Sequence, residues 1–343
     1  MTAGGYCLAI DAMGGDSGPR LTVPAAIATL RDNPDLTLRL FGNAEALMPL
    51  VAGCPESLRE RLLVEHCTEE VTMDDKPATA LRRKRGSSMW RALGAVGDGS
   101  AQACISAGNT GALVAMAMSA LGRLPGISRP AICKALPSTH GKTYLLDMGA
   151  NVDSSAHHLH QFARMATHLV AVVEGIDRPS VSLLNIGSEA GKGDAVVREA
   201  AALLENDAQI NYRGFVEGDG IFFGDVDVVV CDGFAGNVAV KTSEGAARYI
   251  ARLLRHAFAG SWRGKMAGLL VMPLLKPLRQ RLDPAIYNGA TLLGLNGVVI
   301  KSHGGASMPG FCSALDLALI EARRNIPHRI REQLENGNVP ANN

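Results

Sequence analysis

A glycine-rich polar turn at positions 106–111 is the feature of the sequence best suited to bind an anion. It reads Ser-Ala-Gly-Asn-Thr-Gly and opens an apolar helical pattern. The first turn of a helix offers free backbone N–H groups and the positive end of the helix dipole, which together favour an anion. A similar turn follows a strand-like run at 11–16. The two turns predict an anion site; the alternative for the first is a tight strand–helix connection without a ligand.

Further turns of this composition follow other strand-like runs, at 147–151, 185–187 and 231–237. In an open parallel sheet, ligands bind beyond the carboxyl ends of the strands. The sequence therefore predicts that these turns gather their donors at one edge of a sheet.

Familiar catalytic signatures are absent. The sequence contains no GxSxG, HExxH or GxGxxG motif. The triplet Gly141-Lys142-Thr143 resembles the end of a P-loop, but Leu136 stands where the first glycine is needed.

Three histidines, His157, His158 and His160, lie close together in the sequence. On a helix, the first and the third share a face and the second points elsewhere. We therefore expect helix-start or polar roles for them and no metal, although a metal site is the alternative.

The seven cysteines form no CxxC pair, so neither a disulfide framework nor a zinc ribbon is predicted. Cys7 and Cys231 lie in apolar runs and are interpreted as core residues rather than acyl nucleophiles. The start of the sequence has no basic leader followed by an apolar stretch, which predicts a cytoplasmic, reducing location.

Short β-branched runs alternate with helical patterns over the first 230 residues, which predicts βαβ units with helices on both faces of a mostly parallel sheet. The fold class is thus doubly wound, three-layer α/β/α. The strands are expected at 7–12, 36–41, 62–65, 103–106, 143–147, 181–186 and 226–231, with more sheet at 289–301. The helices are expected at 20–32, 88–97, 110–121, 158–174, 192–205 and 311–324. The uncharged stretch 99–122 is interpreted as ending in a buried core helix rather than a membrane span.

Residues 245–282 interrupt this alternation. The segment has helical character and contains eight Lys or Arg residues but no acidic one. Its apolar run 266–275 is too short to cross a bilayer and suits an interfacial segment on anionic lipid, with Trp262, Leu269 and Leu270 in contact. The alternative is a helical hairpin at a dimer interface. We predict one catalytic domain over 1–335, which includes this protruding segment, and a disordered tail at 336–343.

The total charge, 34 basic against 33 acidic residues, favours no polyanionic partner such as nucleic acid. Four consecutive basic residues are the local exception: Arg82, Arg83, Lys84 and Arg85. Such a run is either a solvated face or a docking patch for an acidic partner.

Eight segments together resemble one family, the bacterial phosphate acyltransferases that act as acyl-carrier-protein:phosphate transacylases in phospholipid synthesis. They run in family order over nearly the whole chain: AIDAMGGDSGP (9–19), MDDKPA (73–78), SAGNTGALVA (106–115), LLDMGANVD (145–153), HLHQFA (158–163), LLNIGSE (183–189), DVVVCDGFAGNVAVKT (227–242) and LLGLNGVVIKSHG (292–304). The chain departs from the family pattern at Ser17, at 156–157 and at 305–309, so a role directly after His303 is in doubt.

The resemblance implies a fold similar to phosphotransacetylases and the isocitrate dehydrogenase group, a homodimer, and no cofactor or metal. It also implies a peripheral position on the inner face of the cell membrane, where the product passes to a membrane-bound glycerol-3-phosphate acyltransferase. The implied substrates are a long-chain acyl carrier protein and inorganic phosphate. The alternatives are a phosphotransacetylase that uses acyl-CoA and a non-enzymatic membrane-surface scaffold.

Within this resemblance, roles follow for individual residues. Lys301 and His303 are the expected cationic groups at the reacting centre, and Asp232 and Asn237 are expected to orient them. The basic run 82–85 is expected to dock the carrier. The expected phosphate ligands are Gly14, Gly15, Ser106, Gly108, Asn109, Thr110 and Gly111.

Overall fold

The computed structural model describes residues 5–189, 191–263, 265–267, 271 and 285–336. These residues form one sheet of eleven strands in the order β3-β2-β1-β4-β11-β10-β5-β6-β9-β7-β8. The strands are β1 (Tyr6–Asp11), β2 (Leu36–Gly42), β3 (Leu62–His66), β4 (Ala103–Ser106), β5 (Ala131–Ser138), β6 (Gly141–Leu146), β7 (Ser180–Leu184), β8 (Asn211–Val216), β9 (Val228–Val230), β10 (Ala290–Leu293) and β11 (Val298–Lys301). Leu269 and Leu270, the predicted lipid contacts, lie outside the described residues, as does the tail from 337.

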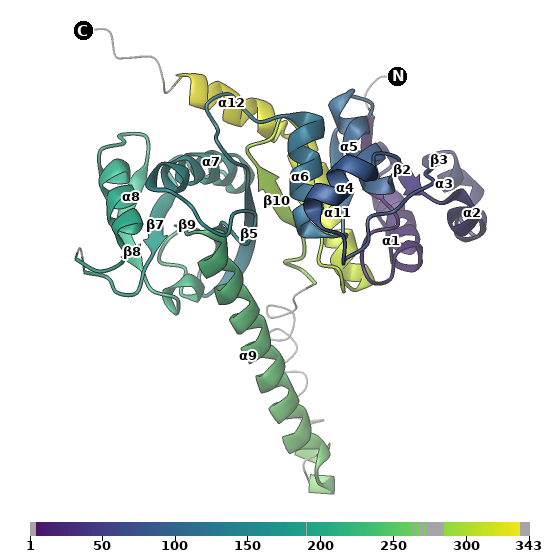
Figure 1. The fold of residues 1–343 in the computed structure, drawn as a ribbon. Coiled ribbons are helices and arrows are strands. Elements are labelled where there is room, and N and C mark those ends of the chain that lie inside the picture. The colour runs from purple at the N-terminus through teal and green to yellow at the C-terminus, as the bar shows by residue number, and fades with distance from the viewer. Residues whose placement is uncertain (1–4, 190, 264, 268–270, 272–284, 337–343) are drawn as a thin grey trace.

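Helices lie on both faces of the sheet, so the predicted three-layer α/β fold is confirmed (Figure 1). They are α1 (Pro19–Asp32), α2 (Ala44–Ala52), α3 (Glu56–Arg59), α4 (Pro77–Arg83), α5 (Ser88–Gly97), α6 (Thr110–Leu121), α7 (Ala156–Glu174), α8 (Ala195–Glu205), α9 (Gly233–Ala259), α11 (Met308–Arg323) and α12 (Ile326–Asn336), with a 3₁₀ turn at η1 (Gly220–Phe222).

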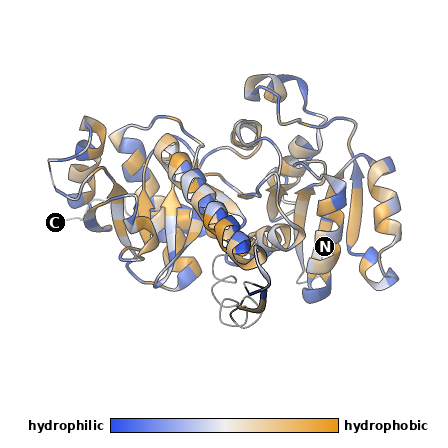
Figure 2. Ribbon diagram, turned by 90° about the horizontal axis from the view of Figure 1, so that it is seen from below, coloured by the Kyte–Doolittle hydropathy of each residue, from blue (hydrophilic) through white to orange (hydrophobic). Residues whose placement is uncertain are grey.

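The alternation of side chains along β1 shows how the sheet is covered on both faces. Leu8 and Ile10 belong to the apolar cluster that includes residues of α1 and α11. Ala9, between them, belongs to the cluster that includes residues of α5 and α6. Because successive side chains of a strand point to opposite faces, a central strand such as β1 is apolar on both of them. The strands accordingly appear predominantly orange in Figure 2.

The sheet is parallel in its two outer parts and antiparallel in the middle. Strands β5 and β10 each pair antiparallel with both of their neighbours. The remaining pairs are parallel. The predicted sheet region 289–301 is therefore two strands, because a turn at Gly294, whose φ is +93°, reverses the chain. Strands β5 and β8 had not been predicted: Lys134 and Pro137 interrupt the apolar run of one, and Arg213 and Gly214 that of the other.

Helix α9 leaves the body of the molecule and projects away from the sheet (Figure 1). It begins twelve residues earlier than the predicted segment, because the Asp232 side chain caps it by accepting a hydrogen bond from the Ala235 amide at 2.7 Å. Tyr249, Ile250 and Leu253 on the projecting part are exposed. No helix in the described part of the chain is both long enough and apolar enough to cross a bilayer.

Candidate functional site

The carboxyl ends of β1, β4 and β11, which are neighbours in the sheet, form the first half of the candidate site. Asp11 ends β1 and is buried, and its two carboxylate oxygens accept hydrogen bonds from the hydroxyls of Ser88 and Ser106, both at 2.6 Å. Burial raises the pKa of Asp11, while these hydrogen bonds and the nearby Lys301 oppose the rise.

Three turns converge here because glycines allow their backbones to touch. A Cβ atom on Gly14 would lie 2.6 Å from the Asp11 carboxylate and 2.8 Å from the Gly108 nitrogen. A Cβ atom on Gly15, whose φ is +88°, would lie 2.9 Å from the carbonyl oxygen of Gly304. The structure thus brings the predicted residues Gly14, Gly15 and Gly108 together with the turn that follows Lys301.

The Gly-Asn-Thr-Gly turn uses part of its polar groups to hold itself. The Gly108 amide donates to the Ser106 hydroxyl at 3.1 Å. The Asn109 side chain caps α6 by accepting from the Ala112 amide at 3.0 Å, and it donates to the carbonyls of residues 73 and 75. In the described part of the chain, no acceptor forms a hydrogen bond with the amides of Thr110 and Gly111. These two N–H groups, rather than the Asn109 side chain, are therefore free for an anion.

Lys301 lies at the end of β11 and is half-buried. Its ammonium donates to the carbonyl oxygen of Ala107 at 3.3 Å and also to that of Ser302. Burial lowers the pKa of Lys301 to about 8, although Asp11 and Asp16 favour its charged form. The cation is therefore present at neutral pH but is poised to lose its proton slightly above it.

His303 follows Lys301 by two residues and is held by its backbone. Its amide donates to the Asn288 side chain at 3.0 Å, and its Nδ1 accepts from the Gly305 amide at 3.0 Å. The ring is exposed on one side. Loss of water on the other side lowers its pKa, and Lys241 lowers it further. His303 is thus close enough to Lys301 for the lysine to lower its pKa as well, and the role of both residues at the reacting centre stays a prediction.

The second half of the site lies where β6 and β9 end. Asp147, directly after β6, is buried and accepts hydrogen bonds from four backbone amides and from the Asn151 side chain. Asp232 caps α9, and Asn237 lies against Gly149, where a Cβ atom would be 3.1 Å from the Asn237 amide nitrogen. Asp232 and Asn237 therefore belong to the base of α9 rather than to direct contacts with Lys301 or His303.

Helix α9 links the two halves electrostatically. Lys241 lies 3.8 Å from Glu244, and Glu244 lies 3.7 Å from Lys134 of β5. Lys241 also lowers the pKa of both Lys301 and His303. The carboxyl edge of the sheet thus holds three lysines and a histidine, with Glu244 between two of the lysines and with Asp11 and Asp16 near the third.

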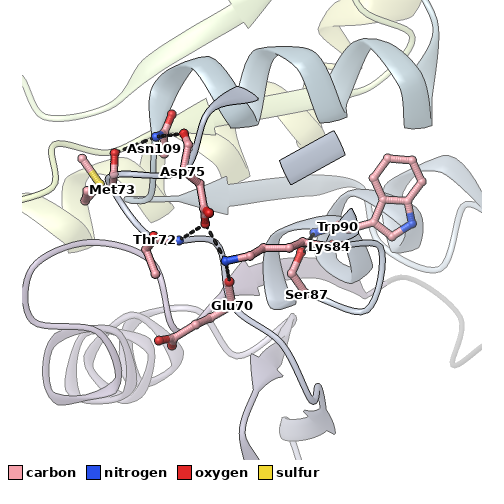
Figure 3. A network of polar contacts seen from close by, with 8 residues as sticks. All are labelled: Glu70, Thr72, Met73, Asp75, Lys84, Ser87, Trp90 and Asn109. Carbon is pink, nitrogen blue, oxygen red and sulfur yellow. Dashed lines mark hydrogen bonds and ion pairs between the residues drawn. The ribbon is translucent and has the colours of Figure 1, made fainter. Parts of the chain in front are cut away.

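The basic run of α4 separates into two kinds of residue. Arg82, Arg83 and Arg85 are exposed, and Arg85 stacks over the Trp90 ring at 5.1 Å. Lys84 instead donates to the Asp75 carboxylate at 2.6 Å and to the Glu70 carbonyl at 2.9 Å (Figure 3). Its ammonium helps to fix the loop that holds Asn109, so only the arginines are available to a partner.

The three histidines have separate partners. His158 and Ser155 form a capping box at the start of α7, as expected for a helix-start role. His160 contacts Asp207 at 2.8 Å, and His157 contacts Gln161 at 3.1 Å. Among the described residues, no three His, Cys, Asp or Glu side chains gather as a metal site.

Of the two cysteines interpreted as core residues, Cys231 is buried and Cys7 is half-buried. Burial raises the pKa of both thiols, so neither is activated as a nucleophile. Trp262, the predicted lipid contact that the structure describes, is exposed and lies under the Arg263 guanidinium at 5.5 Å.

Sequence reasoning had placed Asp11 and Asp147 in the predicted turns without giving them a role, and it had missed Ser88, Lys134, Lys241, Glu244 and Asn288. Asp11 and Asp147 each end an apolar run immediately before a glycine-rich turn, a signal that could have identified them. Lys134 and Glu244 had no such signal, because only the pairing of α9 with β5 brings them together.

Comparison with known proteins gives the family of the chain and agrees with this fold. Residues 6–329 match the family model described as fatty acid synthesis protein. The chain is 51% identical over 328 residues to phosphate acyltransferase from Nitrosococcus oceani, covering 96% of each chain. It is 52% identical over 328 residues to phosphate acyltransferase from Pseudomonas putida, covering 96% of this chain and 97% of the relative.

Among solved structures, a phosphotransacetylase from Streptococcus pyogenes superposes with a TM-score of 0.62 at 18% identity, covering 94% of this chain and 95% of that one. A 4-hydroxythreonine-4-phosphate dehydrogenase from Klebsiella pneumoniae gives a TM-score of 0.56 at 15% identity, covering 94% and 99%. At these identities the likeness shows the fold alone. With half of its residues identical to those relatives over nearly its full length, the chain belongs to the phosphate acyltransferase family of enzymes.

Proposed function

We propose that this enzyme transfers a long-chain acyl group from the thioester of an acyl carrier protein to inorganic phosphate. The observation that supports this most is the cation-rich edge around Lys301, next to the free amides of Thr110 and Gly111. It offers both charge and N–H donors to a phosphate dianion. The family membership supports the acyl transfer, and the exposed arginines of α4 support an acidic protein as the donor.

In the proposed reaction, a phosphate oxygen attacks the thioester carbonyl. The new C–O bond forms as the C–S bond breaks, and the proton of HPO₄²⁻ passes to the departing sulfur, which leaves acyl phosphate and a free thiol. At neutral pH inorganic phosphate is a mixture of the monoanion and the dianion, so a substantial part of it is already the nucleophilic dianion. A thiol of pKa about 8.5 leaves without strong acid assistance. Positioning and charge are therefore what the protein must supply.

Each group at the edge has a role in this proposal. The amides of Thr110 and Gly111 bind phosphate at the start of α6. The Lys301 ammonium faces the oxyanion that develops on the carbonyl, and His303 lies beside it. Asp11 holds Lys301 in its charged form, since a nearby opposite charge favours ionisation.

The protein's surroundings are also part of the proposal. A homodimer in the cytoplasm, resting on the membrane through the segment that follows α9, would deliver acyl phosphate to a membrane-bound glycerol-3-phosphate acyltransferase. The exposed Trp262 and the basic residues around it support lipid contact. We expect the parent protein to co-sediment with anionic vesicles, even when vesicles of neutral lipid are added as a competitor. The Trp262→Glu variant should no longer co-sediment. No pelleting of the parent protein would restrict the segment to subunit contact.

Incubation with phosphate and equal concentrations of hexadecanoyl carrier protein or hexadecanoyl-CoA tests the donor. Formation of acyl phosphate from the carrier, at a kcat/KM at least tenfold above that for CoA, is expected. Equal or better use of CoA would assign the enzyme to the phosphotransacetylase alternative. Absence of acyl phosphate with both donors would contradict the proposed activity.

A further inference from the structure

A cavity lies beside the base of α9. Its volume is about 270 Å³, and it is lined by Gly149, Val152, Gly233, Phe234, Asn237, Val238 and Lys241. Three of the apolar linings are well exposed: Val152 at 74%, Phe234 at 66% and Val238 at 49%. Exposed apolar side chains that gather in one place mark a ligand or partner site.

The fold determines which face of α9 lines this cavity. Phe234, Val238 and Lys241 follow one another at i, i+4 and i+7, so they share one face of the helix. Gly236, on another face, packs so closely that a Cβ atom would lie 1.9 Å from the Asp147 carbonyl oxygen. The first turns of α9 therefore cannot rotate to bury Phe234 and Val238. Figure 2 shows orange segments at this end of the projecting helix, followed by more white and blue.

Lys241 relates the cavity to the reacting edge. This residue lines the cavity, and it is also close enough to Lys301 and His303 to lower the pKa of each. A ligand in the cavity would therefore have an apolar surface along one part and the Lys241 ammonium at one end, whose charge also acts on Lys301 and His303. That pattern matches a linear acyl chain whose carbonyl lies at the cationic end.

We propose that this cavity binds the carbonyl-proximal part of the donor's acyl chain, with Phe234 and Val238 as the residues that distinguish long chains from short ones. The inference rests on the proposed function. Whole small-molecule ligands usually occupy about 300 Å³ or more. The cavity therefore accommodates a segment of the chain, and the remaining methylenes extend beyond it.

Binding of two unreactive thioethers tests the inference without turnover. Isothermal titration would compare S-octylpantetheine with S-methylpantetheine for the parent protein and for Phe234→Ser. The parent should bind the octyl compound at least tenfold more tightly, because burying an apolar chain of this kind is worth more than 1.4 kcal/mol. Phe234→Ser should lose most of that preference and leave the affinity for the methyl compound within twofold.

Tyr249→Ser is the matched control, because it removes an exposed aromatic from the same helix but outside the cavity. It should retain the full preference. The inference would be overturned if the parent bound the two thioethers with equal affinity. It would also be overturned if Phe234→Ser and Tyr249→Ser lost the preference for the octyl compound to the same extent. A change in oligomeric state of Phe234→Ser, measured by light scattering, would assign the patch to subunit contact and overturn it too. Acyl phosphate formation by the parent decides the proposed function separately.

Discussion

Asp11 and Asp147 occupy matching places in the two parts of the molecule, since each is buried where a strand gives way to a glycine-rich turn. They differ in what holds them. Asp11 accepts from two serine hydroxyls and faces the Lys301 ammonium. Asp147 accepts almost entirely from backbone amides and faces the base of α9. Hydroxyls can rotate, whereas amides are fixed, so the first carboxylate is suited to tuning charge and the second to fixing backbone.

Loss of the cation beside Asp11 should have the largest effect. Lys301→Ala should lower kcat by about 10²-fold or more, as expected for a group that stabilises the transition state. The circular dichroism spectrum should remain that of the parent, because Lys301 bonds only to carbonyl oxygens. If kcat of the folded variant fell by less than about threefold, Lys301 would not stabilise the transition state. Asp11 would then have only a structural role, as Asp147 does, and the two carboxylates would not differ.

Asp147→Asn should instead act mainly on stability. An asparagine nitrogen would face amide donors in place of an acceptor, which costs about 2 kcal/mol in the free energy of unfolding. Urea denaturation would measure this, with the slope m unchanged from the parent. If the variant were as stable as the parent but inactive, Asp147 would be part of the reacting centre.

Asp11→Asn is the complementary variant. The serine hydroxyls can reorient toward an amide, so we expect less than about 1 kcal/mol of lost stability. Turnover should fall about tenfold, because Lys301 loses the charge that favours its ammonium form. Urea denaturation and steady-state kinetics of Asp11→Asn and Asp147→Asn, measured side by side, compare the two carboxylates directly. Equal losses of stability and equal losses of turnover in the two variants would contradict the proposed difference.

The pH profile sharpens the contrast further. The pKa of Lys301 is about 8, so its cation is present below that pH and is lost as the pH rises. The kcat/KM of the parent should therefore fall about tenfold between pH 7 and pH 9, because this ratio reports the pKa values of the free enzyme. Lys301→Arg keeps its charge at pH 9, so whatever activity it retains should not show that fall. The same fall in both proteins would assign it to another group.

The smallest effect is expected at the exposed arginines of α4. Arg82→Glu together with Arg83→Glu should raise the KM for acyl carrier protein about threefold and flatten its dependence on salt, because exposed charge pairs are screened. Lys84→Glu serves as the contrast: it removes the ion pair with Asp75 and should lower the melting temperature as well. If the KM of the arginine variant were unaltered, the basic run 82–85 would be a solvated surface and not a docking site for the carrier.

The fold was largely predictable because its strands are apolar on both faces and end in recognisable turns, as at 106–111. The antiparallel centre of the sheet was not predictable. Lys134 and Pro137 interrupt the apolar pattern of β5, and a single turn at Gly294 divides the predicted region 289–301 into two strands. In the site, the glycine-rich turns were predicted from local patterns, whereas the role of Lys301 was expected from the family resemblance. The ion pair of Lys134 with Glu244 was not, because it depends on where a long helix crosses the sheet edge. The single-domain organisation, the residue roles and the lipid contact stay predictions.

Helix α9 also sets a distance. Its 27 residues rise about 1.5 Å each, so it is about 40 Å long, and Lys241 lies near its base. If its far end rests on lipid and the helix stands upright, the reacting edge is held off the bilayer by a spacing comparable to a small protein domain. The helix would then act as a spacer that leaves room for a folded donor to approach the reacting edge from the membrane side.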